Sequence, residues 1–432
     1  MRAWLLHIWE RLRSSLWVIP TLMAIGSAAL AYLSADLNQI ASDWEWARRF
    51  LYSGTPAGTR TLLSTVAGSM ITVAGVSFSV TMVALSLAST QLGPRLLVNF
   101  MRDKGNQLVL GSFIATFMYC LLSLGAISEQ AGYSVSISAS FALLLAVVSL
   151  LLLIYFIHHI ASSMQADVII QSVAKDIDKS LRSLFPATGD PRPSVSNPAE
   201  QGQFTEVSCT ASGYLQGIDE NELMRAAKQN ETCIQVLHRP GHYLTPGLPL
   251  VRVVGRNSVS ADVERRVAGS FIVGGCRTPE QDPEYGIFQL VEIALRALSP
   301  GINDPFTAMT CIDHLSGLLA SVAGSPERPP TRMDSEGTPR LLLDEISFEG
   351  IIEAAFNQIR QSAIGNAAPS IRILEALNRI AGVTNDPARL AALAKQADQL
   401  YDSNLKYLSA ADKAALNERY QQFRETVSSR TN

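Results

Sequence analysis

The sequence predicts a membrane α-helical protein with four transmembrane helices and a cytosolic α+β part, in which a small β-barrel or barrel-sandwich-like module precedes a helical bundle. Three observations lead to this class. Four long apolar stretches occur before residue 160. Short apolar runs separated by Pro/Gly turns follow residue 203. From about residue 284 to the C-terminus, apolar residues instead recur at helical spacing.

The composition excludes several classes of protein. Of the 432 residues 47% are hydrophobic and only 17% are charged, and the net charge of −3 leaves no basic surface for nucleic acid. The five cysteines are far apart and form no CxxC pair, which argues against a disulfide framework or a zinc site. Without a Walker A, GxGxxG, GxSxG or kinase motif, we expect no enzyme, cofactor or metal.

The four apolar stretches are long enough to cross a bilayer. A helix needs about 20 residues to span a hydrocarbon core of roughly 30 Å. The predicted spans are roughly 16–35, 62–89, 107–128 and 137–157, and none contains Asp, Glu, Lys, Arg or His.

The basic residues near these spans predict their orientation. Arg2, Arg11 and Arg13 precede the first span, and Arg95, Arg102 and Lys104 separate the second from the third. The segment 132–136 has no basic residue, although 36–60 carries Arg48, Arg49 and Arg60 beside acidic residues. Because basic residues are enriched in cytoplasmic loops, we expect both termini in the cytoplasm.

The predicted domains are a four-helix transmembrane domain at 1–165, a helical extension and linker at 166–202, a small β-rich module at 203–280 and a helical domain at 281–432. No Pro or Gly occurs between the fourth span and Pro186, so one continuous helix is expected from the bilayer to Leu184. The Pro-rich segment 325–339 is expected to be disordered.

Turns alternate with strands in the β-rich module. Strands are expected at 204–209, 213–217, 232–238 and 250–254, with a helix at 219–230 capped by Asp219. The alternation resembles lipoyl-type barrel-sandwich hybrids, but no acceptor lysine lies between Lys228 and Lys395. His238 and His242 are not expected to bind metal, because Pro240 and Gly241 prevent the helix that would bring them together.

A polar set accompanies a helix-turn-helix at Glu284–Ala308. Ser299-Pro300-Gly301 ends the first helix, and Asp304-Pro305 can begin the second as N-cap and N1. The polar motif candidates are Glu292, Arg296, Asn303 and Asp304. They either lock the turn in place or line a ligand or subunit contact.

A stripe of hydroxyl side chains runs along the second span. Its members recur at steps of four and three residues, with Val76, Val83, Gly68 and Gly75 on or beside it. The pore-lining candidates are Thr65, Ser69, Thr72, Ser79, Ser86 and Thr90. The stripe either packs against a helix or faces a water-filled path, with Val73, Val80 and Leu87 expected on the opposite face.

Three segments carry a resemblance to a known family: STQLGPRLL at 89–97, GSFIATFMY at 111–119 and ALRALSPGINDPFTA at 294–308. Through them the chain resembles an uncharacterised bacterial family of predicted four-span inner-membrane proteins, a domain-of-unknown-function family, with SPGINDPFTA as the most specific mark. The resemblance implies a multi-pass protein of the bacterial inner membrane. It implies no substrate, cofactor or catalytic residue.

Two classes of function fit these patterns. One is a homo-oligomeric channel or pore with a regulatory cytosolic domain, since a pump needs ionisable groups within its spans and these are absent. The other is a membrane-anchored sensor or scaffold whose cytosolic domain binds a ligand or partner. The expected partners are the lipid bilayer and further copies of the chain, with the ligand unknown.

Overall fold

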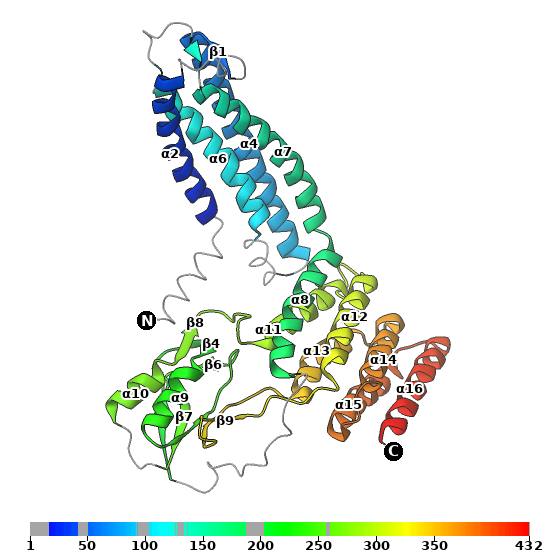
Figure 1. Cartoon of the computed structure of the whole chain (residues 1–432). Helices are drawn as coiled ribbons and strands as arrows, with labels where there is room; N and C mark the ends of the chain where they lie inside the picture. Colours follow the sequence, from blue (N-terminus) through cyan, green and yellow to red (C-terminus); the bar gives the residue numbers. More distant parts are fainter. Residues whose placement is uncertain are drawn as a thin grey trace. The chain divides into compact units, whose positions relative to one another are not determined.

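The computed structural model describes residues 17–41, 51–91, 93, 103–125, 127, 134–135, 137–186, 203–255 and 260–431. The chain divides into two compact units, Met1–Val168 and Ile169–Asn432, which we call unit 1 and unit 2 (Figure 1). The basic residues that predicted the orientation lie outside the described residues, except Arg60 and Lys104. Residues 187–202 of the extension and linker predicted at 166–202 also lie outside them.

Among the described residues of unit 1, four helices are long and apolar enough to cross a membrane, and they lie where the four spans were predicted. They are α2 (Val18–Ala41), α4 (Pro56–Gln91), α6 (Lys104–Gly125) and α7 (Ile137–Ser163). Helix α6 packs against the other three and is the most buried of them. Strand β1 (Ser53–Gly54) connects α2 to α4 in the chain, and β2 (Ser134–Val135) connects α6 to α7. The two strands pair antiparallel.

Close packing and buried hydroxyls hold α6 in place. A Cβ atom on Gly111 would lie 2.6 Å from Met23 Sδ and 3.2 Å from Pro20 Cα, so only glycine lets α2 approach this closely. The buried Tyr119 hydroxyl donates to Ser34 Oγ at 2.9 Å, and Ser34 Oγ lies 3.2 Å from Ser138 Oγ. Small residues and hydrogen bonds are the usual means by which helices associate in lipid.

The expectation of one continuous helix out of the fourth span is wrong. Helix α7 ends at Ser163 and α8 (Ala166–Leu184) begins after a turn in which Gln165 N donates to Ser162 O. Helix α7 is apolar on all sides, whereas α8 buries one face into unit 2 through residues such as Ile170 and Ile177. The helix breaks where the chain passes from an apolar helix to one with a single buried face. Such a break needs neither Pro nor Gly, so the sequence did not predict it.

Two sheets form the β-rich part of unit 2. The five-stranded sheet has the order β3-β7-β5-β10-β9 and the three-stranded sheet the order β6-β4-β8. Their bounds are β3 Phe204–Ser208, β4 Gly213–Ile218, β5 Cys233–Val236, β6 Tyr243–Leu244, β7 Pro249–Val254, β8 Phe271–Gly274, β9 Thr331–Met333 and β10 Pro339–Leu342. The four predicted strands and the helix α9 (Glu220–Gln229) with its Asp219 cap are confirmed. A closed barrel or barrel-sandwich arrangement stays a prediction.

The segment expected to be disordered is part of the larger sheet. Strands β9 and β10 form a hairpin, and β10 pairs parallel with β5, so that Leu341 lies opposite Ile234. Leu341 is fully buried, which explains why this polar segment is ordered: a single apolar strand joins the core of the module. The short helix α10 (Ala261–Ala268) was not predicted.

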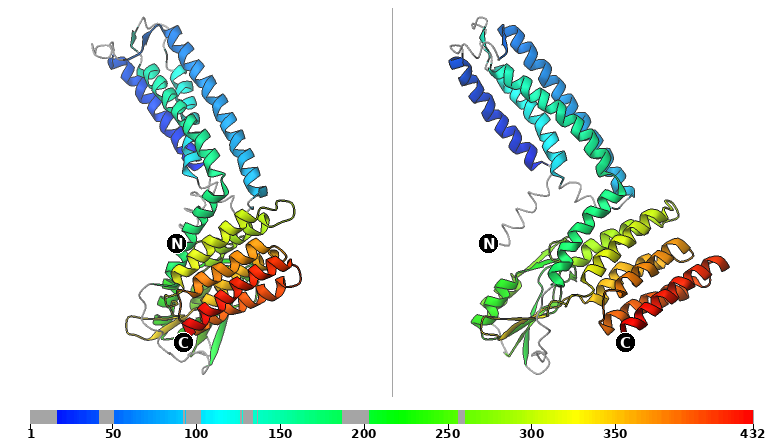
Figure 2. Two further views of the ribbon diagram at one scale, coloured as in Figure 1. Left: turned by 90° about the vertical axis from the view of Figure 1, so that its right-hand side faces the viewer. Right: turned by 45° about the vertical axis from the view of Figure 1, so that its right-hand side comes forward.

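Three helical hairpins complete unit 2 and lie side by side (Figure 2). They are α11 with α12 (Pro283–Ala297 and Pro305–Val322), α13 with α14 (Phe348–Ser362 and Ala367–Ala381), and α15 with α16 (Pro387–Asn404 and Ala410–Thr431). Helix α12 packs on α14 and α14 on α16, while α11 packs on α13 and α13 on α15. Helices account for most of the region predicted to be helical, which also contains β9 and β10, and α8 packs with these helices, since a Cβ atom on Gly286 of α11 would meet Ile177.

Candidate functional site

The hydroxyl stripe lies on the outward face of α4. All six pore-lining candidates are exposed on unit 1, while the opposite face of the helix is buried. The buried face consists of small or apolar residues such as Leu63, Ala67, Ala74, Ala84 and Ala88. The four helices of one chain therefore leave the stripe uncovered.

Four of the six stripe hydroxyls donate hydrogen bonds within their own helix. Thr65, Ser69 and Thr72 each donate at 2.8 Å to the backbone carbonyl four residues earlier, and Thr90 donates to the Ser86 carbonyl at 3.2 Å. A Cβ atom added to Gly68 or Gly75 would meet nothing within 4 Å. The stripe is thus a polar but internally bonded surface with room for close approach.

Of the three residues expected opposite the stripe, Val73 is partly buried and packs against a core cluster, whereas the sequence argument is wrong for the other two. Val80 and Leu87 are exposed, beside the stripe rather than behind it. The reason is geometric: each directly follows a stripe serine, and successive residues of a helix point about 100° apart rather than 180°.

The polar motif lies on α11 and in the turn between α11 and α12. Asn303 has a φ of 49°, a left-handed conformation that Asn tolerates better than most residues, and Asp304 N donates to Ala297 O at 2.7 Å. Asp304 accepts from Thr307 N at 3.1 Å and so caps α12. Glu292 and Arg296 form an i,i+4 ion pair at 3.6 Å on α11. Their contacts support the turn-locking interpretation.

Replacing Asp304 by alanine is expected to destabilise unit 2 by about 0.5 to 2 kcal/mol, because α12 loses its N-cap. Hydrogen bonds from the Thr307 hydroxyl and from backbone N–H groups lower the pKa of Asp304. This contribution is therefore present above the ordinary pKa of aspartate and is lost as the pH falls through the lowered value. Denaturation of Asp304→Ala and Asp304→Asn at several pH values checks this, since asparagine keeps the acceptor but removes the pH dependence. Unchanged stability with altered ligand response would instead favour a binding role.

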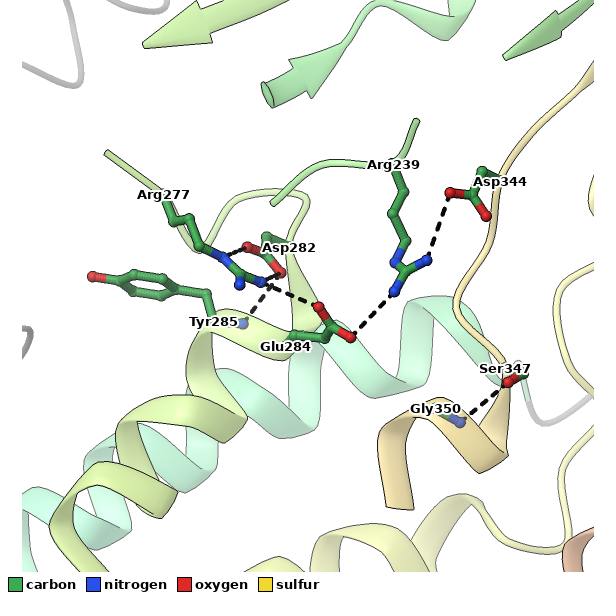
Figure 3. A network of polar contacts seen from close by, with 8 residues as sticks. All are labelled: Arg239, Arg277, Asp282, Glu284, Tyr285, Asp344, Ser347 and Gly350. Carbon is green, nitrogen blue, oxygen red and sulfur yellow. Dashed lines mark hydrogen bonds and ion pairs between the residues drawn. The ribbon is translucent and has the colours of Figure 1, made fainter. Parts of the chain in front are cut away.

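A second polar cluster, unforeseen from the sequence, joins the sheets to the helices (Figure 3). Arg277 binds Asp282 through two hydrogen bonds, Nε to Oδ2 at 2.6 Å and Nη2 to Oδ1 at 2.8 Å. Glu284 lies 3.3 Å from both Arg277 and Arg239, and Arg239 lies 3.5 Å from Asp344. We call these five residues the Arg277 cluster.

The Arg277 cluster ties together three segments that are distant in the chain, around residues 239, 277–284 and 344. Asp282 caps α11 by accepting from Tyr285 N at 3.2 Å, and Asp344 lies just before Ser347, the cap of α13 (Figure 3). Burial raises the pKa of Asp282, an effect that its bonds to Arg277 oppose. Burial and the charge of Arg239 lower the pKa of nearby His242. All five charged side chains are engaged with one another, so the arrangement is suited to mechanical coupling rather than catalysis.

A glycine turn completes the Arg277 cluster. Gly241 has a φ of 96°, and a Cβ atom there would lie 2.5 Å from Asp282 Oδ2 and 2.7 Å from Arg277 Nη2. The turn between His238 and His242 is therefore non-helical as predicted, with the two rings edge to face at 6.0 Å. Only the Pro-Gly pair signalled this site in the sequence, since its charged partners come from unrelated segments.

Unit 2 also has an open groove between α8 and α12 with a volume of about 660 Å³. Its lining is mixed: Gln171, Ala174, Lys175, Asp178, Lys179, Asp313, His314, Gly317 and Leu318. In unit 1, His159 Nε2 lies 2.5 Å from Asp103 Oδ2, joining the end of α7 to the start of α6. His159 is thus a hydrogen-bond partner of Asp103. Among the described residues no cluster has the composition of a metal site.

The described residues thus combine four apolar helices of membrane-spanning length with a second unit of mixed α+β structure, as expected of a membrane protein. The chain belongs to the family described as Predicted membrane protein (DUF2254), which matches residues 13–379. It is 31% identical over 398 residues to uncharacterized proteins of Mycobacterium bovis and Mycobacterium tuberculosis, a match that covers 90% of this chain and 76% of theirs. No solved structure matches the chain.

Proposed function

We propose that the protein is a homo-oligomeric channel or pore in which α4 helices from several copies surround a water-filled path, with unit 2 regulating it. The observation that carries this proposal is the exposed hydroxyl face of α4, from Thr65 to Thr90. One chain has four candidate spans, too few to enclose a pathway by themselves, so a symmetric assembly is required.

The charge distribution supports passive conduction over pumping. In the described part of the four helices the acidic and basic side chains lie near the helix ends, at Asp36, Arg60, Lys104, His158 and His159. A proton- or ion-coupled pump ordinarily needs such groups within the membrane. A hydroxyl-lined path conducts without them.

The stripe is also built for close approach of a neighbour. Gly68 and Gly75 lie beside it with open Cβ positions, on the side where larger residues such as Ile71 and Met82 are also exposed. Small residues at i and i+7 on one face allow helix backbones to approach in lipid. Hydroxyls bonded to their own helix are also tolerated against lipid, so accessibility to water is the property to test.

Single cysteines at Thr72 and Ser79 are expected to react with a small hydrophilic thiol reagent in reconstituted protein. The reacting thiolate needs water, so a dry interface or lipid suppresses the reaction. The background carries Cys120→Ser and Cys276→Ser, because Cys276 is exposed and would otherwise label.

Two control sets make this experiment specific. Cysteines at Ala74 and Ala84 report the buried face, and cysteines at Ile71 and Met82 report the exposed flank. A water-filled path predicts reaction at Thr72 and Ser79 alone, together with altered conductance in Ser79→Lys. If none of the six cysteines, at residues 71, 72, 74, 79, 82 and 84, reacts in an intact oligomer, the channel proposal is contradicted.

The second candidate is a membrane-anchored sensor or scaffold, favoured by the groove between α8 and α12. The groove is large enough for a small ligand, and α8 begins two residues after α7 ends. A ligand there would act on the element that connects unit 2 to the membrane helices. In this proposal the protein resides in a bacterial inner membrane with both termini in the cytoplasm, as the basic residues predict.

A further inference from the structure

The turns of the three helical hairpins lie at one end of unit 2. Gly365, in the α13–α14 turn, donates through its backbone N to Asn404 Oδ1 at 3.0 Å, and its Cβ position lies 3.5 Å from Tyr407 Cβ. The α13–α14 and α15–α16 turns are therefore adjacent.

The α11–α12 turn lies at the same end of unit 2. Contacts between the other ends of the hairpins show this. There the Cβ position of Gly324, after α12, lies 3.2 Å from the Val383 carbonyl, after α14. Arg389 of α15 donates to the Ala323 carbonyl at 2.7 Å. Since α12 and α14 end together and lie side by side, the turns that precede them also lie together (Figure 2).

Each of the three turns exposes large apolar side chains. Phe306 is 75% exposed and Tyr407 68% exposed, and Ile302, Ile364 and Leu405 are exposed as well. We call these five residues the turn edge. At the opposite end, in the described turns 323–325 and 382–386, Val383 is the one large hydrophobic residue that is exposed.

The covalent path of the chain relates the turn edge to the bilayer. The carbonyl of Leu184, the last residue of α8, accepts from Arg328 N at 2.7 Å, which places the C-terminal end of α8 at the end opposite the turn edge. Helix α8 runs beside α12, so its N-terminal end points toward the turn edge. Two residues separate that end of α8 from the last residue of the membrane helix α7.

We propose that the turn edge is a membrane-contact surface that rests on the lipid bilayer, with Phe306 and Tyr407 in the interfacial region. Aromatic side chains are favoured at the boundary between acyl chains and headgroups, where one end of the ring is apolar and the other wet. Lys406, exposed between Leu405 and Tyr407, has the charge that lipid phosphates attract.

The form of the surface favours lipid over a second copy of the chain. The five side chains are spread over three separate turns, and a fluid bilayer accepts such a row without shape complementarity. The short covalent link from α7 to α8 tethers unit 2 to the transmembrane helices, so the effective lipid concentration is high and weak apolar contacts are sufficient.

The test uses the full chain in nanodiscs with an environment-sensitive dye on one cysteine and nitroxide-labelled lipid as quencher. Gly301→Cys places the dye in the first turn, where the Cβ position is open, and Val383→Cys places it at the opposite end. Both are made in a Cys276→Ser background. We expect several-fold stronger quenching at residue 301 than at residue 383.

A second variant separates lipid contact from mere proximity. Phe306→Ser with Tyr407→Ser should reduce quenching at residue 301 without changing thermal stability, because both side chains are exposed. Equal quenching at 301 and 383 overturns the proposal. Cross-linking between copies at residue 301 without lipid quenching also overturns it and assigns the edge to a second chain.

Discussion

Replacing Asp282 by alanine is expected to destabilise unit 2 by about 3 to 5 kcal/mol, because the Arg277 guanidinium is left without its bidentate carboxylate partner. The Asp282 side chain is 1% exposed and that of Arg277 20% exposed, so water cannot replace the lost partner fully. The same substitution removes the N-cap of α11. Together these losses should loosen the joint between the sheets and the helical hairpins.

Buried cysteines provide the readout for this loss. All five tryptophans lie before residue 50, in unit 1, so their fluorescence does not report on unit 2. Cys209 and Cys311 are buried in unit 2, and the rate at which they react with a thiol reagent measures its opening. Asp282→Ala should accelerate both reactions strongly.

An exposed ion pair on α8 supplies the matched control. Asp178 and Arg182 lie 2.7 Å apart, but the Arg182 side chain is 65% exposed. Such exposed pairs are screened by water and add little to stability, so Asp178→Ala should leave both cysteine rates nearly unchanged. Equal rates in Asp282→Ala and Asp178→Ala would show that the Arg277 cluster adds no stability.

Substituting glycines by valine should separate folding of unit 1 from assembly of several chains. Gly111→Val places methyl groups against the backbone of Pro20, so α2 must move away from α6 and the monomer loses stability. Gly75→Val meets nothing within one chain, yet it fills the face through which we propose that copies associate. The expected results are misfolding for Gly111→Val and a folded but smaller species for Gly75→Val.

Size-exclusion chromatography and thermal stability in mild detergent measure both effects. Gly125→Val is the control, because Gly125 is exposed at the end of α6 with an open Cβ position. If the Gly75→Val protein keeps the oligomeric size of the parent, the α4 face is not the surface through which copies associate.

The parts of the fold that depend on local pattern were predictable. Uncharged apolar runs set the four spans, and Asp219, Asp304 and Pro305 marked helix starts because capping is a property of neighbouring residues. The β9–β10 hairpin was missed because its order comes from pairing with β5, far away in the chain, and that pairing leaves no local signal.

The candidate sites divide along the same line. The stripe was visible because one helix carries it, but its exposure depends on where α6 and α7 pack against α4. The Arg277 cluster was invisible because Arg239, Arg277 and Asp344 come from three separate segments, and nothing in a charged residue's neighbours indicates its partner. The turn edge likewise emerges only when the three hairpins stack.

The length of α4 makes bilayer thickness a variable of the protein. Its 36 residues extend about 54 Å, and the stripe from Thr65 to Thr90 about 38 Å, against a hydrocarbon core of roughly 30 Å. The two ends of the stripe therefore contact headgroups or water in any assembly, and its middle, around Thr72 and Ser79, alone distinguishes a wet path from a dry one. Longer acyl chains draw more of these hydroxyls into hydrocarbon, so the lipid itself shifts the balance between separate and associated α4 helices.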